Sequence, residues 1–451
     1  MCAQKQQRQY PVIVVGGGQA GLATSYCLQE KGIAHVVFEK ARIAEAWRSE
    51  RWDTFCLVTP NWQCRLPGFS YADFEAEDDP EGFMSKERVV EFIEAYAASF
   101  DPPVREGVAV HEVTKSADGD GFELSTSDGL YRADQVVAAT GTYHRPRIPP
   151  MAEALPEDVR QLHSSAYETP EALPDGDVLV VGSGQSGAQI AEDLHWAGRQ
   201  VHLAVGSAPR APRRYRGRDV VAWLEDLGYY DLPVYEHPQG EDVRHKTNHY
   251  LTGRDGGHTI DLRQFALEGM QLYGRLDGIE SGPDGDVLHF QPNLEEHLDA
   301  ADASAASIKE RIDEYIAEED LDAPSEPPYV PPWAPAEERL RQNLRDAGIR
   351  TVLWATGYDY DFGWVNLPVF DENGYPEYHR GVTEVPGLYF VGLAWLYTWG
   401  SGRFGGVGRD AKYLADQIEH LRRQGAAAGA QQNGQQAASA SHPPAEVEHE
   451  P

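Results

Sequence analysis

Two copies of a glycine motif, G-x-G-x-x-G, constrain the fold of this chain more than any other feature of its sequence. Their glycines are Gly16, Gly18 and Gly21 in the first copy and Gly182, Gly184 and Gly187 in the second. Each copy follows an apolar run that predicts a buried strand, Tyr10–Val15 or Val178–Val181, and precedes a stretch with helical periodicity. A further apolar run, His35–Glu39 or Val201–Val205, predicts the next strand, so each copy lies inside a βαβ unit.

The three glycines of such a turn have distinct roles. The first permits a tight turn, the second lets the backbone approach a pyrophosphate, and the third lets helix and strand pack closely. Because both copies have the expected context, two ordinary βα turns are the weaker interpretation. The motifs therefore predict two dinucleotide sites. Their expected cofactor-binding residues are Gly16, Gly18, Gln19, Ala20 and Gly21 in one site and Gly182, Ser183, Gly184, Gln185, Ser186 and Gly187 in the other.

The end of the second strand distinguishes the two sites. In the first unit this strand ends at Glu39, 21 residues beyond Gly18. A carboxylate at this position accepts hydrogen bonds from a ribose diol, as in FAD or NAD, and would repel a 2′-phosphate. The first site is therefore expected to bind FAD.

In the second unit no acidic residue ends the strand, and a cluster of arginines follows it. The cluster consists of Arg210, Arg213, Arg214, Arg216 and Arg218. Arginine suits bidentate phosphate binding, so the cluster predicts recognition of the 2′-phosphate of NADPH, with Arg210 and Arg213 as the expected contacts. The alternative is a solvated loop, or a set of ion pairs with acidic residues of the same chain.

The separation of 166 positions from Gly16 to Gly182 indicates that one nucleotide-binding domain is inserted into the other. The predicted fold class is α/β, with two doubly wound, Rossmann-like domains and the NADPH domain inserted into the FAD domain. The expected boundaries are 1–165 and 345–423 for the two parts of the FAD domain and 166–344 for the NADPH domain with a helical insertion. Residues 424–451 are rich in Ala, Gln, Gly and Ser and are expected to form a disordered tail.

Charge and cysteine content argue against several classes of function. The chain carries 39 basic and 72 acidic residues, a net charge of −33. Such a surface repels nucleic acids and anionic membranes, so neither is expected as a partner. None of the four cysteines belongs to a C-x-x-C pair, which argues against a thioredoxin-like redox disulphide. The N-terminus has no signal-peptide pattern and no run of 18 apolar residues occurs, so a cytoplasmic protein is expected.

Two A-T-G elements complete a resemblance to the class B flavin-dependent monooxygenases. They are Ala139-Thr140-Gly141 and Ala355-Thr356-Gly357-Tyr358, and Pro386–Gly392 resembles the strand near the flavin ring in that family. The resemblance covers about residues 10–420. Within the family, the runs 51–62 and 397–404 are similar to a bacterial subgroup that is often encoded beside a nitrilase.

The family's linker fingerprint, F-x-G-x-x-x-H-x-x-x-(F/Y/W), is half matched. His163 and Tyr167 fit the pattern, whereas Glu157 and Val159 stand where the family has Phe and Gly. This departure leaves the flavoprotein fold as the firmer implication and the branch of the family as the weaker one.

The resemblance implies FAD and NADPH as cofactors, and O2 and a small nucleophilic molecule as substrates. NADPH reduces the flavin, one oxygen atom of O2 goes to the substrate, and the other leaves as water. The remaining residues expected at the cofactor sites are Lys40, Trp47, Arg48, Thr140, Gly141, Thr356, Gly357 and Gly392.

Several reactions fit this expectation. N-oxygenation of an amine or amino acid comes first, and Baeyer–Villiger oxidation or oxidative decarboxylation of a 2-oxo acid comes second. A flavin reductase or dehydrogenase without oxygen transfer is an alternative, as is a nucleotide-binding sensor without turnover. A homodimer is compatible with the sequence.

Two polar residues are the candidates for direct roles in catalysis. Asn61 lies in a Thr-Pro-Asn loop where its amide could hold the flavin edge, and a turn-forming Asn is the alternative. Arg403 precedes the last predicted helix and could bind a substrate carboxylate or the flavin, with a surface ion pair as the alternative. The aromatic residues beside it, which could line the substrate pocket or simply belong to the core, are Trp395, Tyr397 and Trp399.

The segment 215–275 contains histidines with metal-like spacing, His245, His249 and His258, but no acidic or cysteine partner stands out, so no metal is expected. The segment could instead be an insertion that faces the substrate. Its candidate polar groups are Asn248, His249, Tyr250, Arg254 and Asp255.

Overall fold

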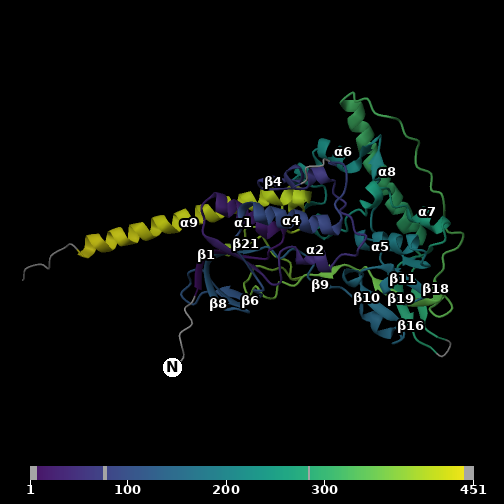
Figure 1. The fold of residues 1–451 in the computed structure, drawn as a ribbon, viewed down its shortest axis with the longest axis horizontal. Helices are drawn as coiled ribbons and strands as arrows, with labels where there is room; N and C mark the ends of the chain where they lie inside the picture. The colour runs from purple at the N-terminus through teal and green to yellow at the C-terminus, as the bar shows by residue number, and fades with distance from the viewer. Residues whose placement is uncertain (1–7, 75–78, 283–284, 441–451) are drawn as a thin grey trace, which may run out of the picture.

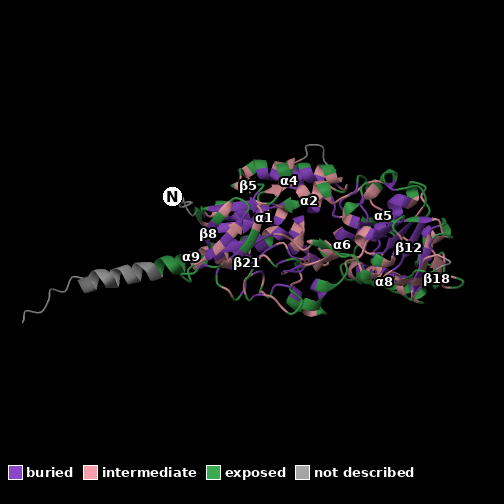
Figure 2. Ribbon diagram, turned by 90° about the horizontal axis from the view of Figure 1, so that it is seen from below, coloured by how far each residue is buried: buried purple, intermediate pink, exposed green. Residues whose placement is uncertain are grey.

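The computed structural model describes residues 8–74, 79–282 and 285–440. The chain forms two lobes, each built around a sheet that contains parallel strands, and strand β9 (Arg145–Pro146) lies between them (Figure 1). Buried residues fill both lobes, so each has its own core (Figure 2). The predicted α/β class with two dinucleotide-binding domains is confirmed.

The first lobe contains a sheet with the strand order β5-β2-β1-β8-β7-β6, in which β21 also pairs with β8. Its strands are β1 (Arg8–Val15), β2 (His35–Glu39), β5 (Val104–Glu106), β6 (Val110–Lys115), β7 (Phe122–Thr126), β8 (Gly129–Ala138) and β21 (Leu388–Phe390). β1 runs parallel to β2 and β8, as the βαβ pattern predicts, whereas β6 and β7 are antiparallel. Residues on alternate sides of β1 enter two different apolar cores, so both faces of the sheet are covered.

Helices α1 (Gln19–Glu30), α4 (Lys86–Phe100) and α9 (Phe404–Ala440) cover one face of this sheet. Ser85 caps α4 by accepting a hydrogen bond from the backbone N–H of Arg88. The shorter elements of this lobe are β3 (Arg65–Leu66), β4 (Phe69–Ser70), α2 (Glu45–Ser49) and α3 (Tyr71–Phe74).

The second lobe contains an all-parallel sheet with the order β10-β19-β11-β12-β15. Its strands are β10 (Arg160–His163), β11 (Asp177–Val181), β12 (Val201–Ala204), β15 (Gln271–Tyr273) and β19 (Ile349–Trp354), and α5 (Gln185–Trp196) connects β11 to β12. Such strands read as continuous apolar runs because both faces are buried.

This sheet corrects two of the expected domain boundaries. β10 and β19 were assigned to the FAD domain (1–165 and 345–423), but both pair within the second sheet, where β19 lies between β10 and β11. The apolar pattern of β19 predicts a buried strand, yet it carries no information about which of two parallel sheets receives it.

The chain between β12 and β19 builds the outer part of the second lobe. Its elements are β13 (Arg214–Tyr215), β14 (Arg218–Asp219), α6 (Val220–Asp226), α7 (Leu262–Leu267), β16 (Leu276–Glu280), β17 (Val287–Phe290), α8 (Leu294–Glu318) and β18 (Arg341–Asn343). Trp223 of α6 and Ile312 of α8 share one apolar cluster, and Trp399 from the end of the first lobe packs against it. This cluster therefore joins the insertion to the first lobe.

Two connections between the lobes run side by side. β9 pairs in antiparallel fashion with β20 (Tyr358–Asp359). His163, from the linker fingerprint, accepts a hydrogen bond from the backbone N–H of Ser165 through Nδ1 and donates through Nε2 to the carbonyl oxygen of Gly357, at 3.0 Å. His163 thus holds in place the segment in which the chain returns from the second lobe to the first.

A buried carboxylate forms a second junction. Asp193 of α5 accepts hydrogen bonds from the hydroxyl of Tyr167 at 2.6 Å and from that of Thr54 at 2.7 Å, and it pairs with Arg254 at 2.7 Å. The three donors come from the linker, from the first lobe and from the insertion. One carboxylate therefore holds three separate segments together.

The last helix corrects the prediction of a disordered tail from residue 424. α9 continues to Ala440, because this stretch, although poor in apolar residues, is rich in Ala and Gln and contains no Pro. The rest of the predicted tail, 441–451, lies outside the described residues. Across the part of the chain that the structure describes, no helix is long and apolar enough to cross a lipid bilayer.

Candidate active site

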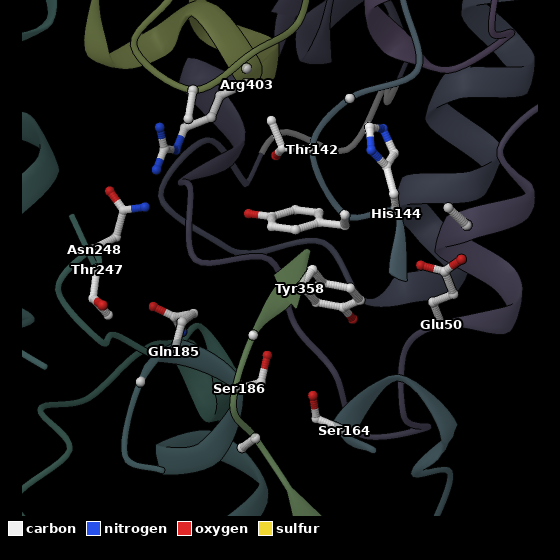
Figure 3. Close-up of a pocket in the computed structure, with 18 of the residues that line it drawn as sticks. Glu50, Thr142, His144, Ser164, Gln185, Ser186, Thr247, Asn248, Tyr358 and Arg403 are labelled. Carbon is white, nitrogen blue, oxygen red and sulfur yellow. The ribbon is translucent and has the colours of Figure 1, made fainter. Parts of the chain in front are cut away.

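A cavity of about 1940 Å³ lies between the two lobes. Both glycine turns line it, at the carboxyl ends of β1 and β11, which is where parallel sheets bind ligands. Its volume exceeds the roughly 300–1,000 Å³ of a pocket for one small ligand. Figure 3 shows side chains from both sides of the cavity, with His144 and Arg403 opposite Gln185 and Asn248.

The two glycine turns have the same geometry. Gly16 has a φ of +111° and Gly182 a φ of +102°, a backbone conformation that favours glycine. A Cβ on either residue would lie 2.6 Å from a carbonyl oxygen, that of Ala139 in the first lobe and that of Ala355 in the second. Each A-T-G element is therefore the wall against which the first glycine of a motif packs.

In the glycine motifs the third glycine allows helix and strand to pack, whereas the second leaves room at the cavity, as the sequence predicts. A Cβ on Gly21 would lie 1.9 Å from the carbonyl oxygen of Gly16, and one on Gly187 would lie 1.9 Å from that of Gly182. These two glycines allow helix and strand to pack, and neither lines the cavity. Gly18, in contrast, has open space beside it and does line the cavity.

Glu39 supports the first turn while remaining half-buried at the cavity. One carboxylate oxygen accepts a hydrogen bond from the backbone N–H of Gly17 at 2.7 Å and the other from that of Ala41 at 2.9 Å. A carboxylate oxygen has a second lone pair, so each can accept a further bond from a ribose hydroxyl.

Most of the expected site residues lie together at the cavity. These are Gly16, Gly18, Gln19, Ala20, Glu39, Lys40, Trp47, Thr140, Gly141, Gly182, Ser183, Gly184, Gln185, Ser186, Thr356, Gly357, Gly392 and Arg403. Gln185 is held in place because its amide exchanges two hydrogen bonds with the backbone of Leu251. The hydroxyl of Thr140 is buried without a hydrogen-bond partner.

Arg210 and Arg213 are the main correction to the predicted site. Arg210 is 4% exposed and pairs with Asp302 at 2.7 Å, and Arg213 is fully buried and pairs with Asp219 at 2.6 Å. Neither side chain lines the cavity. Both are internal ion pairs of the insertion, which was the alternative interpretation of the cluster.

Asn61 and Arg48 are also placed away from the cavity. Asn61 is 3% exposed, and its amide donates to the carbonyl oxygen of Asp79 at 2.9 Å, so it orders the loop that contains it. Arg48 of α2 forms an ion pair with Glu94 of α4. Neither residue lines the cavity. The sequence could not show which side of each short segment would face inward.

Arg403 does line the cavity. Its guanidinium donates to the carbonyl oxygen of Trp399 at 2.6 Å and lies 3.6 Å from the centre of the Trp399 ring. Of the three aromatic residues that were expected near it, only Trp399 lines the cavity; Trp395 is buried in a small separate cluster, and Tyr397 packs against the core of the first lobe.

His144 was not anticipated as a site residue. It lines the cavity, and its Nδ1 accepts a hydrogen bond from the backbone N–H of Asp361 at 2.8 Å. Burial lowers the pKa of His144, so its imidazole is neutral near pH 7. The sequence places it three residues after Gly141, but an isolated histidine after a strand carries no distinctive pattern.

The histidines of the insertion have separate partners. His249 lies 2.9 Å from the hydroxyl of Ser304, His258 pairs with Glu192 at 2.6 Å, and His245 packs edge-on against the ring of Tyr375. Of the candidate insertion residues, Asn248 and His249 line the cavity, whereas Tyr250 is in the core and Arg254 pairs with Asp193.

Two dinucleotide turns facing one cavity define the class of a two-domain oxidoreductase. The chain belongs to the pyridine nucleotide-disulphide oxidoreductase family, whose model matches residues 13–261. It is 33% identical to an uncharacterised CzcO-like oxidoreductase of Geobacillus kaustophilus, over 90% of this chain and 97% of that protein. These matches confirm the predicted enzyme class, an oxidoreductase of a flavin- and pyridine-nucleotide-dependent family.

More distant similarities extend the comparison. A segment is 30% identical to the probable indole-3-pyruvate monooxygenase YUCCA4 of Arabidopsis thaliana, over 46% of this chain and 49% of that protein. The fold matches the ornithine N-hydroxylase of Kutzneria sp. 744 with a TM-score of 0.60 and 16% identity, over 92% of this chain and 100% of that one. The predicted resemblance to flavin-dependent monooxygenases is confirmed as a similarity of one segment and of the fold.

Proposed function

We propose that this protein is a monooxygenase that binds FAD at the first glycine turn and NADPH at the second, and that it uses O2 to oxygenate a small nucleophilic substrate. The observation that carries the proposal is the single cavity lined by both turns, with no cysteine among the lining residues that the structure describes. Electrons from a nicotinamide would therefore have a flavin, and then O2, as their acceptors.

The three cysteines that the structure describes argue against disulphide chemistry at the cavity. Cys27 and Cys64 are buried and Cys56 is half-buried, and none of the three is paired. Burial raises the pKa of Cys27 to about 12 and also raises that of Cys56. Because the thiolate is the reactive form, these thiols are poor redox groups.

The residues at the first turn fit FAD. Gly18 leaves room for a pyrophosphate at the N-terminus of α1, and Glu39 has free lone pairs for a ribose diol. The buried hydroxyl of Thr140, which has no hydrogen-bond partner among the described residues, would gain one from the cofactor. When bound, FAD supplies hydride acceptance and O2 activation.

The residues of the chain bind the two nucleotides, orient them and shield the site from water. The backbone N–H groups at the starts of α1 and α5 bind the two pyrophosphates, and Gln185, fixed to Leu251, positions the second nucleotide. Trp47 and Phe404 stack at 5.9 Å beside the first turn and exclude water from it.

Selectivity for NADPH is assigned to Arg275 in place of Arg210 and Arg213. Arg275 follows β15, which lies next to β12 in the sheet, so it reaches the carboxyl edge where the adenine ribose binds. Its side chain is exposed, lines the cavity with Ser207, and has no ion pair among the described residues. An arginine at this edge suits a 2′-phosphate.

N-oxygenation of an amine or amino acid is the first candidate reaction. It is supported by the fold shared with an ornithine N-hydroxylase whose structure contains reduced FAD, NADP+ and L-ornithine. Oxidation of a 2-oxo acid is the second candidate, supported by the segment similar to an indole-3-pyruvate monooxygenase.

Isotope labelling tests the proposal. The purified holoenzyme is incubated with NADPH, 18O2 and panels of amines, amino acids and 2-oxo acids. The masses of the products are then measured by mass spectrometry. A product with one 18O atom, formed with consumption of NADPH, supports a monooxygenase. NADPH consumption that yields only hydrogen peroxide with every panel member would instead establish a reductase, and protein without flavin or turnover would favour a sensor.

A further inference from the structure

Arg403 is half-buried at the cavity and has no acidic partner among the described residues, unlike the buried arginines of the insertion. Arg210, Arg213 and Arg263 each form an ion pair with an aspartate. Among the described residues no ion pair involves Arg403. Its guanidinium donates to the backbone of Trp399 and lies over the Trp399 ring, and its electrostatic neighbours are the hydroxyls of Tyr143, Tyr229 and Tyr230. In a chain with 72 acidic residues, an inward arginine without a carboxylate indicates that its partner comes from outside the protein.

The wall around Arg403 is apolar and aromatic. Tyr230 packs against Trp399 with ring centres 4.7 Å apart, and Tyr229 packs against Tyr230 at 5.7 Å. The other apolar residues of this wall, which also line the cavity, are Val220, Val221 and Leu224 of α6 and Ile308 of α8. This part of the cavity suits a ligand with a hydrophobic body.

The charge of the cavity is opposite to that of the protein. Nine lysines and arginines line it against four carboxylates, although the chain as a whole has a net charge of −33. The four carboxylates, Glu39, Glu45, Glu50 and Asp361, all lie outside α6 and α8. The cavity side of α8 instead adds Arg311, which has no ion pair among the described residues.

We propose that the substrate is an organic carboxylate with an apolar or aromatic body, and that Arg403 binds its carboxylate. The planar guanidinium offers two parallel N–H donors to a carboxylate. Asn248 points toward Arg403 from the opposite side of the cavity, where its amide can donate to the same group (Figure 3). The hydrophobic body then lies against Trp399, Tyr230 and α6.

This inference rests on the proposed function and narrows it. A substrate that carries only an ammonium group would meet Arg403 and Arg311, and no carboxylate of α6 or α8 lines the cavity to receive it. Amino acids and oxo acids remain candidates, because both carry a carboxylate. Simple alkyl amines do not.

Binding can be measured without turnover. The holoenzyme is titrated with phenylalkanoic acids of increasing chain length, with the corresponding amides and with the corresponding amines, while changes in the flavin absorbance are recorded. We expect at least one acid to bind, with its amide and amine at least tenfold weaker, because only the acid forms a charge-assisted pair.

Three variants test whether Arg403 is the group that binds the carboxylate. Arg403→Met is expected to weaken acid binding at least tenfold and to leave amide binding unchanged, while Arg403→Lys restores part of the acid binding. Arg214→Met removes an exposed arginine that does not line the cavity, so it should bind acids like the wild type.

The outcomes separate this inference from the proposed function. Equal binding of acid, amide and amine, or no binding of any acid, would overturn the carboxylate assignment even if NADPH oxidation and flavin content were normal. Loss of flavin from Arg403→Met, with acid binding restored once FAD is added back, would show that Arg403 serves the cofactor and would also overturn it. Absence of flavin from the wild type refutes the proposed function itself.

Discussion

At the scale of single residues, some arginines of this protein pair with aspartates inside the insertion, whereas others face the cavity. Arg210 and Arg213 follow the second βαβ unit, as phosphate-binding arginines do, yet each is buried against an aspartate. Removing one partner of such a pair leaves a buried charge unpaired and costs about 3–5 kcal/mol. Each arginine is therefore required by its aspartate and is not free to bind a phosphate. Arg275, which is exposed at the cavity, is the arginine available to a nucleotide.

Arg275→Ala should therefore weaken NADPH binding about 10- to 100-fold and leave NADH binding unchanged, because a charge-assisted hydrogen bond contributes about 1.5–3 kcal/mol. The measurement is the Kd of each nucleotide for the oxidised enzyme, together with the KM ratio. Arg214→Ala is the matched control, since it belongs to the original cluster and does not line the cavity. If Arg214→Ala weakened NADPH binding and Arg275→Ala did not, the assignment to Arg275 would be wrong.

For single residues, the sequence predicts roles that depend on near neighbours but not pairings that the tertiary fold creates. Glycine roles are set by neighbours a few residues away, and the clashes that a Cβ would meet at Gly21 and Gly187 confirm them. An arginine's partner is set by the tertiary fold: Asp302 lies 92 residues beyond Arg210 in the sequence. Nothing local to Arg210 predicts that pairing.

At the scale of elements, both βαβ units form where the apolar runs and glycine motifs predict them. The prediction failed for β10 and β19, which join the second sheet, because strand pairing between distant segments leaves no mark in a local pattern. The two A-T-G elements also indicate which lobe each segment belongs to, and the expected domain boundaries did not take this into account. Ala139 packs against the first motif and Ala355 against the second, so each element belongs to the lobe of its own glycine turn.

The junction around Asp193 gives an element-level prediction. Asp193→Ala should lower the free energy of unfolding by about 3–5 kcal/mol, because it removes the acceptor of three donors and leaves Arg254 with only the exposed Asp255, 3.8 Å away. Tyr167→Phe removes one of these hydrogen bonds and should cost only about 1–3 kcal/mol. The melting temperatures of the two variants, measured by calorimetry, compare the effects.

The control for this junction is Asp177, the first residue of β11, whose carboxylate is more exposed and bonds to His202 of β12. Asp177→Ala should shift the melting temperature less than Asp193→Ala. Equal shifts would mean that Asp193 does not hold the three segments together, and that its hydrogen bonds are incidental to stability.

At the scale of the whole molecule, a net charge of −33 coexists with a cavity lined by more basic than acidic side chains. The excess acid therefore lies on the rest of the protein. Like charges on a folded chain repel one another and destabilise the compact state. The cavity, in contrast, concentrates positive charge where anionic nucleotides, and the carboxylate substrate that we propose, would bind.

Salt should therefore stabilise this protein. Raising NaCl from about 10 mM to about 500 mM shortens the screening length from roughly 30 Å to a few ångströms and weakens long-range repulsion between carboxylates. Exposed ion pairs such as Arg8–Asp128 are weakened as well, but each contributes only about 0–1 kcal/mol. We expect the melting temperature to rise by several degrees, and equally in KCl, because screening does not depend on the cation. A fall in melting temperature with salt would show that ion pairs outweigh net repulsion, and a rise in only one of the two salts would point to specific ion binding.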